Sequence, residues 1–343
     1  MSVYKAYKKR ALKQKTFTLF LLFATLFFLW LSLISGYNGV NMSDTFKLFN
    51  TDEQFFTIVS SIRLPRALAA LLVGMLLGLS GVVMQGILRN SLASPFTLGI
   101  SQAAGFGAAF AIIVFENHNA GLETLSLWFV PFCAFIASML CSLLIIFLGK
   151  KVKMSPMVLI LAGVGLGSLF HSATMFLQYF TTEINAAATL FWTFGDLSKA
   201  TYNILFILSI TLFFSFIIIW SSHWKFDALG FGDDNAYNKG VNVNSFRLWM
   251  LLFGSLCTAI AVSFFGIIGF IGLVAPHIVK LILGNSHGAL IPLSALSGGV
   301  LLLGADFFAR MLLYPSILPV GIITSFIGAP MLLYLLITHK KRQ

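Results

Sequence analysis

Long, nearly uninterrupted apolar runs constrain this fold more than any other feature of the sequence. A membrane-spanning helix needs about 20 mostly apolar residues. Clear runs of that size lie at 17–35, 67–88, 96–115, 127–148, 156–179 and 202–222. An almost continuous apolar region at 248–338 adds room for four passes, the eighth near 274–283. Because a helix satisfies its own backbone polar groups in lipid, we expect an all-α integral membrane protein with about ten transmembrane helices.

The distribution of charge predicts the orientation of the chain. Only 10% of residues are charged, against roughly 25% in soluble domains. Of 22 Lys and Arg, the ten-pass topology places 17 inside and five outside, as the positive-inside rule requires. Both the basic N-terminus, 1–16, and the basic C-terminus are therefore expected to be cytoplasmic. We predict a single transmembrane domain over 1–343, multi-pass in the cytoplasmic membrane and surrounded by lipid, with no nucleic-acid partner despite the net charge of +11.

Two arginines, Arg63 and Arg66, are predicted at the outer mouth of the second helix. Two cations at a helix N-terminus oppose the helix dipole, which favours an acidic partner outside the membrane. The alternative is a pair of arginines that snorkel to the membrane interface. Further along the chain, Asp306 and Arg310 stand four residues apart on one helix and can pair, with Arg310 also reaching the outer mouth.

Small and polar residues of the second and third helices suggest either close packing or a pathway. Gly74, Gly78 and Gly81 share one helix face, which allows another helix to approach closely. Gln85 and Asn90, near the inner end, are placed to bond across helices or to face a translocation path. Gly99 opens a glycine-rich stretch that permits tight packing or a bent helix beside a cavity.

The loop 223–247 is the one sizeable cytoplasmic loop of this topology. Asp233, Asp234 and Ala236 suit the start of a short helix, with Gly240 as its C-terminal cap. A short helix on the cytoplasmic face is what a membrane subunit needs in order to dock a soluble motor. A merely solvated loop is the alternative.

The sequence carries no pattern of an enzyme. It has no G-x-x-x-x-G-K-[ST] phosphate loop, no G-x-S-x-G and no H-E-x-x-H. The three cysteines lie within apolar runs, and no His, Cys, Asp or Glu cluster has metal-ligand spacing. We expect no catalytic residue, no metal site and no cofactor in this chain.

Ordered motifs from about residue 55 to the C-terminus resemble the permeases of type II ABC importers, which take up ferric siderophores, haem and cobalamin. The motifs are Arg63-Leu-Pro-Arg66, Ser80-Gly81…Gln85…Asn90-x-Leu-Ala-x-Pro95…Leu98-Gly99, Trp192-x-x-Gly195, Gly232-Asp233…Ala236…Gly240-Val, Gly269-Phe-Ile-Gly-Leu…Pro276-His277, Pro292-x-Ser294…Gly298, Ala305-Asp306…Ala309-Arg310 and Leu318-Pro-Val-Gly321…Gly328-Ala-Pro330. The resemblance implies ten helices in the type II permease fold, with two identical or homologous permeases around a central path.

The same resemblance implies partners and their docking sites. Two cytoplasmic ATPase subunits would use ATP and Mg, and an external solute-binding protein would deliver a metal chelate. In relatives, outer arginines receive acidic residues of the binding protein, which maps onto Arg63, Arg66 and Arg310. The coupling helix maps onto Leu229–Gly240, including Leu229, Gly232, Asp233, Asp234, Ala236 and Gly240. Gly81, Gln85, Asn90 and Gly99 map onto the path or its packing.

Departures from the family pattern and two other functions stay open. Four positions differ from the usual family pattern: Ser91 stands where relatives have a proline, Ser94 where they have an acidic residue, Lys280 where they have an arginine, and Ile317 where they have a glutamate. Gating roles at those positions are therefore open. A secondary transporter driven by an ion gradient would need buried carboxylates, for which Asp306 is the candidate. A membrane-embedded enzyme would need a catalytic constellation, and none is evident. The sequence does not name the chelate, nor whether the second permease is identical.

Overall fold

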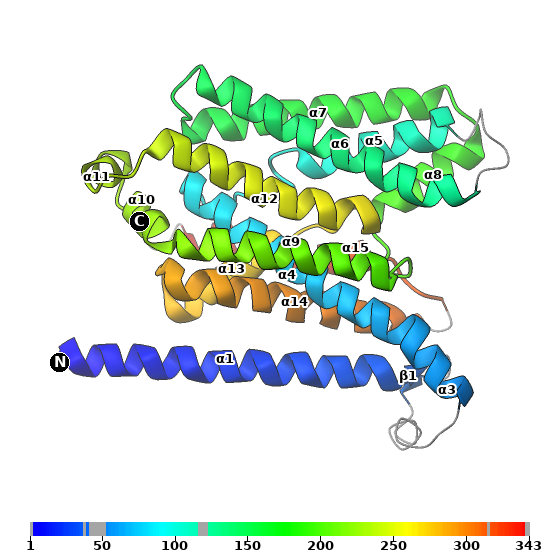
Figure 1. Ribbon diagram of the computed structural model, residues 1–343, viewed down its shortest axis with the longest axis horizontal. Coiled ribbons are helices and arrows are strands. Elements are labelled where there is room, and N and C mark those ends of the chain that lie inside the picture. The colour runs from blue at the N-terminus through cyan, green and yellow to red at the C-terminus, as the bar shows by residue number, and fades with distance from the viewer. Residues whose placement is uncertain (1–2, 37–38, 41–52, 116–122, 314–315, 340–343) are drawn as a thin grey trace.

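The computed structural model describes residues 3–36, 39–40, 53–115, 123–313 and 316–339. The eight long helices are α1 (Val3–Ile34), α4 (Leu64–Leu88), α6 (Glu123–Lys150), α7 (Pro156–Tyr179), α9 (Tyr202–Ser221), α12 (Val243–Phe265), α14 (His287–Met311) and α15 (Val320–His339). They run roughly along one direction and form a bundle (Figure 1). The basic residues predicted at the C-terminal end, 340–342, and Lys47 lie outside the described residues.

Shorter elements connect the long helices. The helical ones are α3 (Glu53–Ile58), the π-helix η1 (Val59–Arg63), α5 (Ile100–Phe110), the π-helix η2 (Ala111–Phe115), α8 (Glu183–Thr193), α10 (His223–Gly230), α11 (Asp233–Asn238) and α13 (Ile271–Leu283). Two-residue strands, β1 (Ser35–Gly36) and β2 (Gly39–Val40), pair antiparallel after α1. The widened turn of η1 ends at Arg63, two residues before Pro65, which lacks the N–H that a regular helical turn would use there.

The described residues fit the predicted membrane protein. Seven helices are long and apolar enough to cross a membrane, and three shorter apolar helices lie at Ile100–Val114, Ile271–Leu283 and Val320–Met331. The prediction of an all-α integral membrane fold is confirmed. The seven long helices and the three shorter ones agree with a ten-pass topology. The number of passes and the cytoplasmic location of both termini remain predictions.

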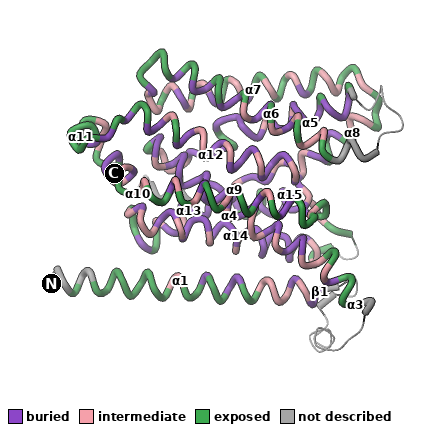
Figure 2. The backbone as a smooth tube through the Cα atoms, viewed as in Figure 1, coloured by how far each residue is buried: buried purple, intermediate pink, exposed green. Residues whose placement is uncertain are grey.

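Helix α4 forms the centre of the bundle, whereas α1 lies along its edge with much of its surface exposed (Figure 2). The predicted glycine face of α4 accounts for this position. A Cβ added at Gly74 would meet the backbone of Gly298, and one at Gly78 would meet the backbone of Ser294. Both partners lie on α14. The prediction of close packing through small residues is therefore confirmed, and dispersion contacts between the backbones hold the two helices together.

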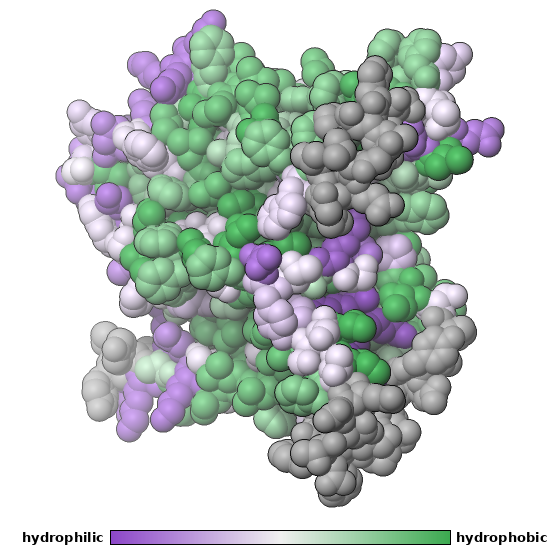
Figure 3. Space-filling model, turned by 45° about the vertical axis from the view of Figure 1, so that its right-hand side comes forward, coloured by the Kyte–Doolittle hydropathy of each residue, from purple (hydrophilic) through white to green (hydrophobic). Residues whose placement is uncertain are grey.

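The two ends of the bundle differ in the elements that they carry. Helix α1 begins and α15 ends where α10 and α11 lie, while α3, η1 and the start of α4 lie at the opposite end (Figure 1). Apolar surface covers much of one face, with hydrophilic residues gathered toward its margins and in a patch between the grey segments (Figure 3). We call the α10–α11 end the inner end and the η1 end the outer end, following the predicted orientation.

Candidate functional site

Three side chains form a buried ion cluster at the outer end. Asp306 is fully buried and lies between two guanidinium groups. The Arg66 Nε and Nη2 atoms lie 2.9 Å from Asp306 Oδ1, and Arg310 Nε lies 3.1 Å from Oδ2. The predicted pairing of Asp306 with Arg310 is confirmed. Sequence reasoning missed Arg66 as the third member of this outer triad, because the partner stands 240 residues away along the chain.

The outer arginines also complete the end of α1. Arg63 donates to the carbonyl of Leu33 at 2.7 Å, and Arg310 donates to the Ser35 hydroxyl at 3.0 Å. The last carbonyls of a helix lack intrahelical donors, and cations are favourable beside them. Arg63 and Arg310 are thus stabilised at the C-terminal end of α1, whereas Arg66, the other cation at the start of α4, is paired with Asp306. The structure brings together all three residues that the sequence predicted for docking; their docking role itself stays a prediction.

A hollow of about 650 Å³ opens between the start of α13 and α15. Four aromatic side chains line it, Phe96, Phe194, Phe270 and Phe326, together with small residues of α15. The rings of Phe96 and Phe270 stack with centroids 6.3 Å apart. The described residues that line the hollow include no ionisable side chain.

Two non-helical segments lead to this hollow. The first, 89–99, which we call the re-entrant segment, joins α4 to α5, and the second, 266–270, joins α12 to α13. Both contribute lining residues. In lipid, a non-helical backbone is tolerated where it is buried in protein or lines a cavity. The sequence predicted a helix from residue 96, whereas α5 begins at Ile100 because Gly99 adopts a left-handed backbone (φ 76°).

The residues predicted for the path take different places. Asn90 lies in the re-entrant segment and accepts a hydrogen bond from the Leu92 amide at 2.9 Å. Gly99 packs against α7, where a Cβ would meet the Gly163 carbonyl at 2.6 Å. Gly81 packs against the backbone of Gly272 in α13. These three positions thus support the walls of the bundle and do not line the hollow, although the segment of Asn90 and Gly99 does reach it.

Gln85 links two helices near the inner end. Its amide donates to the Leu273 carbonyl at 3.2 Å, and its carbonyl oxygen accepts from Lys280 Nζ at 2.9 Å. Both partners belong to α13. Of the two roles expected for Gln85, the cross-helix hydrogen bond is thus the one that the structure shows.

The inner loop folds into two short helices, α10 and α11. The predicted helix start at Asp233 and the predicted cap are both confirmed, since α11 begins there and Gly240 takes a left-handed backbone (φ 80°). Gly232 immediately precedes α11, and the Ala236 side chain is buried beneath it. Asp234 is exposed, but Leu229 belongs to α10 and is fully buried, so Leu229 holds the loop to the bundle.

Asp233 is the best-connected side chain of α11. The guanidinium of Arg247, from α12, donates two hydrogen bonds of 2.8 Å to its carboxylate, and Arg89 lies 3.5 Å away. Hydrogen bonds from Arg247 hold the pKa of Asp233 below its ordinary value; burial opposes this, and the charges of both arginines support it. The sequence offered no signal for Arg247 beyond a single charge at the start of an apolar run.

A hydrogen-bonded contact joins the inner loop to α14. The Asp227 carboxylate accepts the backbone N–H of His287 and lies 2.8 Å from its ring Nδ1. Because His287 is the first residue of α14, this carboxylate satisfies one of the unpaired amides of a helix start. Burial raises the pKa of Asp227, but the hydrogen bonds from His287 together with the nearby His287 and His223 side chains outweigh it and keep that pKa below its ordinary value.

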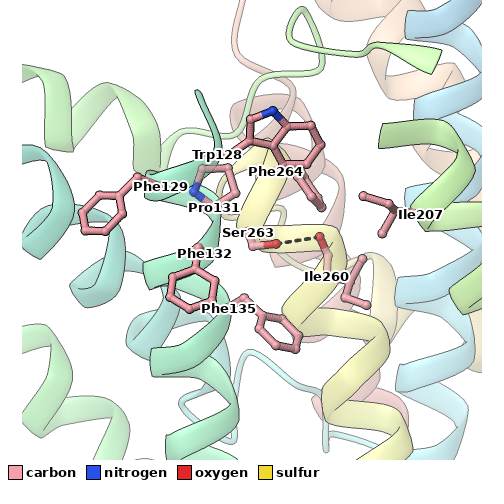
Figure 4. A pocket seen from close by; sticks show the side chains of 9 residues that line it. All are labelled: Trp128, Phe129, Pro131, Phe132, Phe135, Ile207, Ile260, Ser263 and Phe264. Atoms are coloured by element: carbon pink, nitrogen blue, oxygen red, sulfur yellow. Dashed lines mark hydrogen bonds between the residues drawn. The ribbon is translucent and has the colours of Figure 1, made fainter. Parts of the chain in front are cut away.

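A separate hollow of about 570 Å³ lies between α6, α9 and α12. Figure 4 shows apolar and aromatic side chains around it, Trp128 and Phe132 among them. Its one hydroxyl, on Ser263, donates to the Ile260 carbonyl of its own helix at 3.0 Å. This hollow therefore presents hydrocarbon and suits an acyl chain better than a polar cargo.

Within the described part of the chain, no group of three or more His, Cys, Asp or Glu is placed to hold a metal ion.

A bundle of apolar helices with a hollow between α13 and α15 and charged sites at opposite ends is the architecture expected of a membrane transport subunit. The model of the FecCD transport family matches residues 24–338. The chain belongs to this family and is a multi-pass permease subunit of an ABC importer.

Individual relatives cover most of this chain. A candidate ABC transporter permease of Methanocaldococcus jannaschii is 45% identical over 289 residues, 83% of each chain. The Fe(3+)-citrate import system permease protein YfmE of Bacillus subtilis is 33% identical over 341 residues, 98% of this chain and 100% of the relative. The solved inward-facing conformation of a candidate metal-chelate type ABC transporter has a TM-score of 0.81 and 29% identity, covering 95% of this chain and 98% of that one.

Proposed function

We propose that this permease carries a ferric siderophore or a related metal chelate across the cytoplasmic membrane. The observation that carries the proposal is the hollow lined by Phe96 and Phe270 from two non-helical segments. A volume of about 650 Å³ in one subunit suits one half of a path for a large cargo. Among the described lining residues, no ionisable side chain is placed to hold the chelate tightly, which suits weak binding and release during passage. The Bacillus relative, named for ferric citrate import, supports this cargo class.

At the outer end, we propose that a solute-binding protein docks on the arginine cluster. Arg66 and Arg310 flank the Asp306 carboxylate, so the outer triad has a formal net charge of +1, and Arg63 lies beside it at the end of α1. A concentrated positive charge attracts an acidic partner and orients it during encounter. Arg66 is 7% exposed, so its contribution comes mainly through the field of the cluster.

At the inner end, we propose that α10 and α11 dock a separate ATPase. Phe231 and Tyr237 are 73% and 74% exposed, beside the acidic start of α11. Exposed aromatic residues outside the lipid-facing surface are typical anchors of a protein interface. A pair of ATPase subunits would supply the ATP and Mg chemistry, so this chain itself would need no cofactor. A second permease, identical or homologous, would complete the path.

The ion-coupled alternative depends on Asp306. Its carboxylate is held between Arg66 and Arg310, and two cations beside it disfavour the binding of a third. The structure therefore favours a structural role for the one buried carboxylate that this alternative required.

Uptake by the reconstituted complex tests the proposal. The permease would be purified together with the ATPase and the solute-binding protein that associate with it and inserted into liposomes. ⁵⁵Fe-labelled ferric citrate, hydroxamate and catecholate chelates, haem and cobalamin would be offered with and without ATP. We expect ATP-dependent uptake of at least one ferric chelate. Uptake that follows an ion gradient without ATP would refute the proposal, and uptake of cobalamin alone would refute the iron cargo.

A further inference from the structure

Arg247 joins four parts of the bundle at the inner end. Its side chain is 1% exposed, although it carries a charge. The guanidinium binds Asp233 of α11 through two hydrogen bonds and also donates to the carbonyl of Ile87, in the last turn of α4, at 3.0 Å. A longer bond of 3.4 Å reaches the carbonyl of Met154, in the turn before α7. The planar fork of an arginine suits this use, since it fixes direction as well as distance.

Asp233 extends this connection to the re-entrant segment. Its Oδ1 atom lies 3.5 Å from Nη2 of Arg89, and both of these side chains are 41% exposed. Arg89 is the first residue after α4 and has a left-handed backbone (φ 49°). A Cβ at Gly232, which precedes α11, would lie 3.7 Å from the Arg89 guanidinium. The start of the re-entrant segment therefore lies directly against the start of α11.

Local hydrogen bonds stiffen the re-entrant segment between this contact and the hollow. The Asn90 amide donates to the Gln85 carbonyl, and the Asn90 side chain accepts from Leu92. Farther on, the Ser94 amide donates to the Thr97 hydroxyl at 2.9 Å. Phe96 follows in the wall of the hollow. A segment braced in this way transmits a displacement at Arg89 to Phe96 instead of absorbing it.

We propose that Arg247, Asp233 and Arg89 form a joint that makes α11 and the re-entrant segment move as one body. In this inference, which rests on the proposed ATPase coupling, Arg247 fixes Asp233 in place. Arg89 is the positioning residue through which movement of α11 displaces the wall of the hollow. The joint couples the motor to the path without passing through the length of a transmembrane helix.

The test uses the complete complex with its ATPase in proteoliposomes. Arg89→Gln removes the partly exposed charge and leaves the Arg247–Asp233 pair in place, so we expect folding to be retained. Arg89→Lys keeps the charge. Lys150→Gln, at the exposed inner end of α6, is the matched control for the loss of one cation. Complex yield, ATP hydrolysis and uptake of a ferric chelate would be measured for each variant.

We expect Arg89→Gln to lower uptake per ATP hydrolysed by about fivefold or more, the lower end of coupling between linked sites, with complex yield unchanged. Arg89→Lys should recover most of the ratio, and Lys150→Gln should keep it. Spin labels at Ser91, half-buried in the re-entrant segment, and at the exposed Asn238 should hold one distance across the ATP cycle in the otherwise unaltered protein and lose it in Arg89→Gln.

The possible failures are distinguishable. An unchanged ratio in Arg89→Gln, with normal ATP-driven uptake, would overturn the joint while leaving the proposed function in place. A label distance that changes during the cycle of the otherwise unaltered protein would also overturn it. Failure of any ATPase to bind the purified permease would overturn the proposed function and the inference together.

Discussion

Replacement of Asp306 by asparagine isolates the energetics of the outer triad. The carboxylate accepts from Arg66 through one oxygen and from Arg310 through the other. Asparagine has nearly the same shape, but its amide nitrogen donates and cannot accept. One guanidinium therefore loses its acceptor, and two buried cations are left without a compensating charge.

The size of the effect follows from burial. The side chain of Asp306 is 0% exposed, and those of Arg66 and Arg310 are 9% and 12% exposed. Removal of one partner from a buried ion cluster destabilises a protein by about 3–5 kcal/mol. Replacement of all charged members by apolar residues of similar volume often leaves stability unchanged or raises it by about 1–4 kcal/mol. The triple variant Arg66→Met, Asp306→Leu, Arg310→Met should therefore recover most of the stability that Asp306→Asn loses.

Unfolding of the purified permease in mixed micelles, titrated with sodium dodecyl sulfate, measures both variants. Asp234→Asn is the control, since that carboxylate is exposed on α11 and its loss should change stability by only about 0.5 kcal/mol. A loss below about 1 kcal/mol for Asp306→Asn would refute the reasoning, because that is the range of exposed ion pairs.

Three further predictions follow from the described contacts. Gly81→Ala should destabilise the protein by about 1–3 kcal/mol or prevent folding, because the added methyl group meets the backbone of α13. Gly165→Ala is the control and should be tolerated, since its Cβ would have open space around it. Thermal unfolding compares the two variants. The stability difference between the unaltered protein and Asp233→Asn should be constant from pH 7 to pH 5 and shrink only as the pH falls below about 4. The reason is that a carboxyl group with a lowered pKa in the folded protein contributes stability above its unfolded-state pKa and loses that contribution in acid. A difference that shrinks already between pH 7 and pH 5 would contradict this. Asp227→Ala should destabilise the start of α14 by about 0.5–2 kcal/mol, seen as faster amide hydrogen exchange after His287; unchanged exchange there would count against its capping role.

Local patterns in the sequence predicted much of this fold. The apolar runs predicted helices at α4, α6, α7 and α9 because lipid leaves few other solutions for the backbone. The spacing of Asp306 and Arg310 predicted their pairing, since residues four apart meet on a helix. Turn chemistry predicted α11 and its glycine cap. Each of these inferences needed only residues that are close along the chain.

Features that depend on distant residues escaped prediction. The re-entrant segment was expected to be helical from residue 96, because its composition is apolar and only its packing against α7 demands a left-handed glycine at Gly99. The break at 266–270 lay within a continuous apolar region. Arg247 looked like one more inner cation, yet its partners come from α11, α4 and the turn before α7. Leu229 was grouped with the docking helix, although the neighbouring short helix buries it.

A permease that links an external receptor to an internal motor must place η1 and α11 on opposite sides of the membrane, and cysteine labelling tests this most directly. Ser61→Cys in η1 and Asn238→Cys in α11 both place the thiol at exposed positions. A membrane-impermeant maleimide should label position 61 only from outside intact cells and position 238 only in inside-out vesicles. Labelling of both positions from the same side would contradict the predicted orientation and, with it, the proposed docking of receptor and motor at opposite ends.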